Sequence, residues 1–168
     1  MAAVVSIAGF LLLASSAASQ TPDDNLIVPG QRIGKWTLAM SVEAIVKVLG
    51  EPPFLMEGLS GGVPTQPGVL AYDWRGPFGL GLGTKNDRTV LVLYTSGTLK
   101  YKTAKGVKYG APLGSVESAY GKPTATLLAA QGSLDIYDRL GLAVRYHRGK
   151  VEIIAVFLPG TAQRIWKF

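Results

Sequence analysis

His147 is the only histidine in the 168-residue chain, which makes it the first side chain to consider as a catalytic base. It ends a run, residues 142–147, in which strand alternation places His147 beside Arg145 and opposite the apolar residues. A histidine base needs a fixed carboxylate or hydroxyl partner. Asp138 and Ser133 are conceivable partners by topology, but no spacing specifies either of them. We therefore predict no catalytic residue, and a hydrolase that uses His147 is the weakest of three function hypotheses.

Metal and phosphate chemistry find little support in the composition. The chain has no cysteine, which excludes disulfides, thiolate metal sites and a thiol nucleophile. Asp73 and Asp138 occupy matching positions in two similar segments, which favours a shared folding role over a cation site. The glycines before Lys85 lack the Gly-x4-Gly-Lys-Ser/Thr spacing of a phosphate loop. The sequence predicts neither a metal nor a cofactor.

Four lysines stand close together in the middle of the chain: Lys100, Lys102, Lys105 and Lys108. No acidic residue occurs between Asp87 and Glu117. Basic residues interleaved with tyrosines can bind nucleic acid, but the export signal described below argues against a nucleic-acid partner. The stretch is either a solvated connector or a patch that attaches the protein to an anionic envelope surface, an attraction that salt screens.

The leading hypothesis is a protein-binding surface on the open face of a sheet. In residues 79–83 glycines alternate with leucines, so a strand with its leucines inward presents an outer face without side chains. A partner can approach the backbone closely there. The residues predicted to contact the partner are Trp74, Arg139, Arg145, Tyr146 and His147.

Two similar blocks of helix and strands would position these residues. Residues 42–49 carry apolar side chains at helical spacing, with Ser41 as N-cap and a Gly50-x-Pro52 stop. Residues 113–120 repeat this pattern at a constant offset. Strand-like runs follow the helices at residues 70–75, 78–84 and 89–95, and again at 134–139, 141–147 and 151–158.

The expected fold class is α+β, with two tandem helix-plus-β-meander repeats whose short helices pack on one face of an antiparallel sheet. Residues 27–97 form the first predicted repeat and residues 98–160 the second. Residues 161–168 form a C-terminal tail. Residues 56–67 are expected to be a long, mobile loop.

The two helix-and-stop segments support a family resemblance. The first set runs from Leu38 to the Gly50-x-Pro52 stop, and the second ends Tyr120-Gly121-Lys122-Pro123. Together they resemble the tandem-repeat β-lactamase inhibitor proteins and the SmpA/OmlA-type domain of small outer-membrane lipoproteins, over roughly residues 27–160. The resemblance implies proteins that bind other proteins through an exposed sheet face. The former group is disulfide-bonded and the latter is anchored through a cysteine, so neither specific activity carries over to this cysteine-free chain.

The N-terminus predicts export. Residues 4–14 are an unbroken apolar run, and small residues follow before Gln20, which is typical of a signal peptide over residues 1–19. Residues 20–26 would form a linker. The alternative is an uncleaved anchor, although the run is short against the roughly 20 residues of a membrane span. The whole chain has 48% hydrophobic residues and a net charge of +6, so we expect the part after residue 19 to be a folded, basic domain. We predict an exported, periplasmic or secreted, non-enzymatic protein-binding module of the bacterial envelope. Its protein partner and its oligomeric state stay open.

Overall fold

The structure is a computed structural model that describes residues 24–60, 63–74, 79–86, 88–95, 100–129 and 132–167. The predicted signal peptide, residues 1–19, lies outside the described residues. The predicted boundary between the two repeats, at residues 97 and 98, also lies outside them. The predicted linker ends inside a strand, because Leu26 begins β1 (Leu26–Val28).

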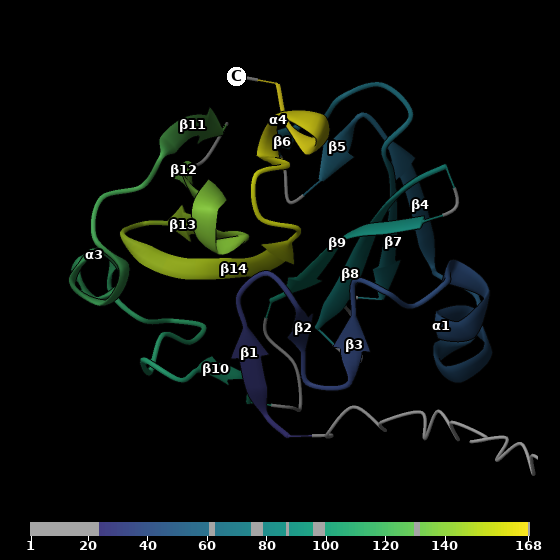
Figure 1. The fold of residues 1–168 in the computed structure, drawn as a ribbon, viewed down its shortest axis with the longest axis horizontal. Helices are drawn as coiled ribbons and strands as arrows, with labels where there is room; N and C mark the ends of the chain where they lie inside the picture. Colours follow the sequence, from purple (N-terminus) through teal and green to yellow (C-terminus); the bar gives the residue numbers. More distant parts are fainter. Residues whose placement is uncertain are drawn as a thin grey trace, which may run out of the picture.

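An antiparallel sheet of eight strands forms the centre of the fold, in the order β11-β12-β13-β14-β9-β8-β7-β4. The middle of this sheet is the pairing of β14 with β9, in which Val156 lies opposite Val92. β4 and β11 are therefore its two edges (Figure 1). The strands are β4 (Phe54–Glu57), β7 (Leu70–Trp74), β8 (Leu80–Lys85), β9 (Arg88–Tyr94), β11 (Ala125–Ala129), β12 (Gly132–Tyr137), β13 (Leu142–His147) and β14 (Lys150–Phe157).

One face of this sheet packs against a second sheet and two short helices. The second sheet has the order β10-β1-β2-β3, with β2 at Arg32–Ile33, β3 at Trp36–Thr37 and β10 at Lys102–Thr103. The helices α1 (Val42–Leu49) and α3 (Leu113–Tyr120) lie at opposite ends of the molecule (Figure 1). The core between these layers includes Ile27, Ile33, Trp36, Ile45, Trp74, Val116 and Tyr146.

Local signals explain where α1 begins and ends. The Ser41 hydroxyl accepts a hydrogen bond from the backbone N–H of Ala44 at 3.2 Å, as an N-cap residue does. Gly50 ends the helix with φ 78°, and its N–H donates to the Val46 carbonyl at 2.7 Å. Within α1 only Ile45 is buried, so the helix depends on the core beneath it.

The opposite face of the large sheet is also covered. The hairpin of β5 (Leu59–Ser60) and β6 (Val63–Pro64), together with α4 (Ala162–Ile165), lies on this side of the sheet (Figure 1). Ala162, Ile165 and Trp166 join a second core with Leu91 and Phe157. The segment 56–67, predicted to be a mobile loop, is instead tied to α4, because the Gln66 N–H donates to the Ile165 carbonyl at 2.7 Å.

The predicted α+β class, with two helix-plus-meander repeats and helices as the covering layer, is wrong. The protein is mostly β, with two large sheets and both faces of the longer one covered. Helices of eight residues, such as α1 and α3, are about 12 Å long. Eight strands spaced about 4.8 Å apart span about 34 Å. Two such helices leave most of the sheet bare, so a second sheet and the C-terminal segment complete the burial.

No helix among the described residues has both the length and the apolar character that crossing a membrane requires.

Candidate functional site

The predicted partner-binding residues do not share a surface. Trp74 is 1% exposed, and its indole N–H donates to the Gly50 carbonyl at 3.0 Å, so it fastens β7 to the end of α1. Tyr146 is 3% exposed and belongs to the same core. Both predictions are wrong, because the second sheet and the helices cover the face on which these two side chains lie.

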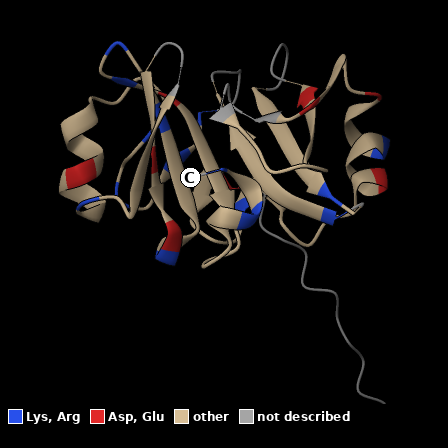
Figure 2. Cartoon of the chain, turned by 90° about the horizontal axis from the view of Figure 1, so that it is seen from above, with Lys and Arg blue, Asp and Glu red and all other residues tan. Residues whose placement is uncertain are grey.

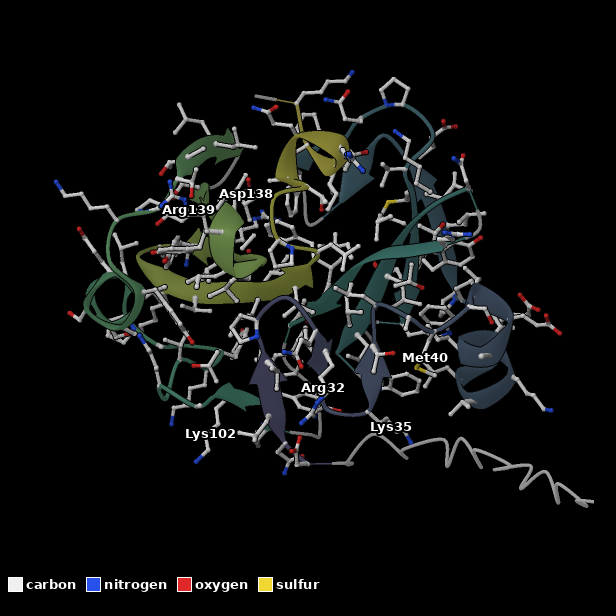
Figure 3. The ribbon with its side chains drawn as sticks, viewed as in Figure 1. Arg32, Lys35, Met40, Lys102, Asp138 and Arg139 are labelled. Atoms are coloured by element: carbon white, nitrogen blue, oxygen red, sulfur yellow. The ribbon has the colours of Figure 1, made fainter. Side chains whose placement is uncertain are left out.

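Of the three remaining residues, Arg139 lies apart from Arg145 and His147, which are both on β13 (Leu142–His147). Arg139 is exposed in the short 3-10 helix η1 (Asp138–Leu140), on the opposite side of the molecule from Lys102 (Figure 3). Arg145 is half-buried on β13, where its Nε lies 3.4 Å from a Glu152 carboxylate oxygen. His147, also half-buried, ends β13. These residues do not form one contact surface.

The glycine-bearing face of β8 is closed as well. Gly81 and Gly83 are buried, and a Cβ on Gly83 would lie 3.0 Å from the Leu91 Cβ. The side chains of Leu91 and Leu93 on the neighbouring strand fill the space in which a partner was predicted to bind. The glycines therefore serve packing within the sheet, and the open-face prediction is wrong.

The four lysines are all exposed, but they have different surroundings. Lys102 lies on β10, and its backbone forms an isolated antiparallel β-bridge with that of Lys108, so these two residues are neighbours. Lys105 donates to the Ala119 carbonyl at 2.6 Å and lies 4.9 Å from the centre of the Tyr120 ring, at the end of α3. A cation there is favoured by the helix dipole. Tyr101 and Val107 between the lysines are buried, so this stretch is part of the core rather than a connector.

The two residues considered as hydrolytic partners of His147, Ser133 and Asp138, lie away from the cleft that His147 lines. Its cleft, of about 440 Å³, has Glu152 as carboxylate and Tyr109 as hydroxyl among the described lining residues. Ser133 lines a different cleft and pairs with Tyr146, on the other face of the sheet from His147. Asp138 is engaged elsewhere, since its carboxylate accepts from the Ala162 N–H at 3.0 Å. Hydrolysis through His147 remains a prediction that this geometry does not support.

The predicted equivalence of Asp73 and Asp138 does not hold. Asp73 is a buried residue of strand β7, whereas Asp138 begins the 3-10 helix η1. Over the described ranges, no group of three or more histidine, cysteine, aspartate or glutamate side chains is arranged to hold a metal ion.

The edge strand β4 is an exposed apolar element that the sequence analysis did not single out. Its four residues are all exposed, with Phe54 at 66% and Leu55 at 57%. β4 pairs with β7 on one side and is the last strand of the sheet on the other. The opposite edge strand, β11, differs because it contacts β6. Pro52 and Pro53 before β4 had been interpreted only as a helix stop, which hid the strand that follows.

Two buried tyrosines report on the integrity of the core. Burial, together with the nearby Asp135 carboxylate, raises the pKa of Tyr137 to about 12 and raises the pKa of Tyr146 further. Between the ordinary tyrosine pKa of about 10 and these raised values, the unfolded chain releases protons that the folded chain retains. The free energy of unfolding must therefore fall as pH rises through this window.

We expect the melting temperature to fall steeply above about pH 10 and the Tyr146→Phe variant to show a shallower fall, because it has no phenol to ionise at this position. Circular dichroism melts at intervals from pH 8 to pH 12 measure both slopes. Tyr109→Phe, at an exposed position, is the matched control. Identical slopes for the wild type and Tyr146→Phe would contradict the assignment.

Comparison with known proteins finds structural neighbours at low sequence identity, among them two proteins of secreted type. No protein-family model matches the chain, and no curated protein matches its sequence. An extracellular protein containing an SCP domain from Bacillus anthracis is similar with a TM-score of 0.46 and 10% identity, over 76% of this chain and 46% of that one. A cysteine-rich secretory protein from Staphylococcus aureus is similar with a TM-score of 0.46 and 11% identity, over 77% of this chain and 48% of that one. The chain spans about half the length of these two proteins. These scores do not define a shared fold, so the function is argued from the chain's own residues.

Proposed function

We propose that this chain is an exported, non-enzymatic protein-binding module of the bacterial envelope, and that an extended segment of its partner adds a strand to the edge of β4. The observation that carries the proposal is the outer edge of β4, which pairs with no strand of the described ranges and carries a run of exposed apolar side chains. Natural proteins protect sheet edges with charges, prolines or covering segments. Of the four residues in β4 only Glu57 is charged, so the strand is poorly protected.

Charge narrows the class of partner. Glu57 ends β4 and Glu51 lies three residues before its first residue; both are exposed, although the chain as a whole carries a net charge of +6. A partner strand with apolar residues at its centre and Lys or Arg at its ends complements this edge. Backbone hydrogen bonds would supply affinity, and the contacts with Phe54 and Leu55 would supply specificity. Placement at the envelope rests on the apolar N-terminal run and on the family resemblance.

Photo-crosslinking tests this edge directly. A photo-reactive phenylalanine analogue replaces Phe54 in the full chain, and the same analogue replaces Leu128 as a control at 86% exposure on the other edge. We expect position 54, and not position 128, to crosslink to one envelope protein through a segment with the predicted composition. Introducing Phe54→Lys and Leu55→Lys together should lower capture of that protein about tenfold or more, because charges replace the apolar contacts.

Three results would contradict the proposal: no product at position 54, the same products at both positions, or a crosslink to a second copy of this chain. The last result would make β4 a dimer interface instead. Leu128→Lys is the control substitution and should leave capture unchanged.

The adjacent exposed lysines Lys102 and Lys108 favour a second candidate function, attachment to an anionic envelope surface. Capture of partners from an extract of the bacterial envelope distinguishes the two candidate functions. Attachment through lysines is released by a high-salt wash and lost when Lys102 and Lys108 become glutamine, whereas a strand pairing with apolar contacts withstands the wash.

A further inference from the structure

A basic cleft lies on the side of the large sheet that α4 covers, away from the β4 edge. Its volume is about 720 Å³, within the usual range for small-molecule sites. Three separate parts of the chain meet there: the turn between β8 and β9, the segment after β14 with α4, and Gln66. The lining residues are Gln66, Lys85, Asn86, Arg88, Val90, Leu158, Thr161, Gln163, Arg164 and Ile165.

The charged side chains among the described lining residues of this cleft have one sign. Lys85, Arg88 and Arg164 line it, and none of the described lining residues is a carboxylate. Across the described part of the chain, these three side chains form no ion pair. Cations gathered in a concave surface focus a positive potential into it. An anion held between them would relieve their mutual repulsion, and arginine is well suited to phosphate and carboxylate groups.

The wall that carries Arg164 is fixed before any ligand arrives. The Gln66 side-chain amide donates to the Gln163 carbonyl at 3.0 Å and to the Trp166 carbonyl at 3.2 Å. The backbone of Thr65 also forms an isolated β-bridge with that of Trp166. Figure 2 shows α4 beside the C-terminus with a basic position and no acidic one. A wall held in this way loses little conformational entropy on binding.

The cleft also has an apolar part. Val90 and the exposed Leu158 line it, with the buried Ile165 beneath the surface, and the neutral side chains of Asn86 and Thr161 also line it. An inorganic anion would leave these apolar side chains without contact. A ligand with one anionic group and one compact apolar group would use both parts of the lining.

We propose that this cleft binds a small amphiphilic anion, with its phosphate or carboxylate among Lys85, Arg88 and Arg164 and its apolar group against Val90 and Leu158. The ligand is either a free organic anion or the head group of an anionic lipid, which share this chemistry. The site is separate from the β4 edge and does not depend on the function proposed for that edge.

Titration calorimetry with phenyl phosphate tests the site in the full chain. We expect phenyl phosphate to bind about tenfold more tightly than inorganic phosphate, because only the former contacts the apolar part. Arg88→Gln and Arg164→Gln should each weaken phenyl phosphate binding about tenfold, because each variant loses a charge-assisted hydrogen bond to the phosphate. Both arginines are exposed, so the variants should fold, which melting temperatures verify. Arg139→Gln removes an exposed arginine outside the cleft and is the matched control.

Sedimentation with vesicles of an anionic lipid separates the two sources. If vesicle binding is lost in Arg88→Gln and Arg164→Gln but kept in Arg139→Gln, the ligand is a lipid head group. If the protein binds phenyl phosphate but does not bind the vesicles, the ligand is a free anion. The proposal is overturned if phenyl phosphate does not bind, or if the cleft variants bind it as the wild type does. It is also overturned if Arg139→Gln weakens binding equally, because binding then follows net charge alone.

Discussion

Replacing Gly141 with alanine is expected to destabilise the protein by about 3 kcal/mol or more. Gly141 has φ 65°, and a Cβ at this position would collide with the Phe157 carbonyl oxygen and lie 2.7 Å from the Gly30 Cα. Both obstacles are backbone atoms and cannot rotate away. The Gly141 carbonyl also accepts hydrogen bonds from the N–H groups of Gly30 at 3.1 Å and Phe157 at 3.0 Å. A shift of this turn therefore disturbs β14 and the β1–β2 turn together.

Chemical denaturation measures this loss, and Gly149→Ala separates its two causes. Gly149 has a similar φ of 72°, but nothing lies within 4 Å of its added Cβ. The free energy of unfolding of Gly149→Ala should fall by only about 1 kcal/mol, because alanine is unfavourable in the left-handed region. Equal losses in the two variants would mean that backbone conformation alone, and not the close approach of β14 and Gly30, requires glycine at position 141.

Replacing Trp166 with alanine is expected to cost about 3–5 kcal/mol, as for other buried aromatic residues. Trp166 is 1% exposed, and its ring packs edge-on against Phe157 with 5.2 Å between the ring centres. It anchors α4 over the second core. Without it, the side of the sheet that carries Leu91 and Ile153 loses part of its cover.

The variant Trp166→Phe is the matched control for this prediction. The indole nitrogen of Trp166 is buried and has no hydrogen-bond partner within the described ranges, so removing it breaks no hydrogen bond there. Trp166→Phe should lose less than half of what Trp166→Ala loses, because it keeps an aromatic ring against Phe157. Thermal melts of the three proteins decide this. A small loss in Trp166→Ala would mean that the residues after Phe157 are not needed to close the core.

The secondary structure followed from local pattern to a large degree. Ser41 and Gly50 bound α1 as their capping preferences require. The strand-like run at residues 141–147 became β13, Leu142–His147, and alternation correctly separated Arg145 from Leu142 and Val144. Such signals depend on residues within a few positions of one another, so they survive without knowledge of the fold.

The candidate surfaces did not follow from local pattern. Trp74 and Tyr146 were assigned to a binding face although both lie in the core, because the sequence does not state which face of a strand is covered. Gly81 and Gly83 were interpreted as an approach for a partner, yet Leu91 and Leu93 from the next strand occupy that space. The basic cleft joins Gln66, Arg88 and Arg164, which are far apart in the chain and share no motif.

By itself, the sequence determined the helix limits, six of the eight strands of the large sheet, the absence of thiol chemistry and the apolar N-terminal run. Short-range forces decide these features: hydrogen-bonding geometry, turn preferences and the alternation of side chains. Only the tertiary structure decided that both faces of the large sheet are covered, that β4 is one of its edge strands, and that Lys85, Arg88 and Arg164 share one cleft. Burial and charge clustering arise where segments that are distant in the chain come into contact. Those contacts depend on the packing of all the layers of the fold together.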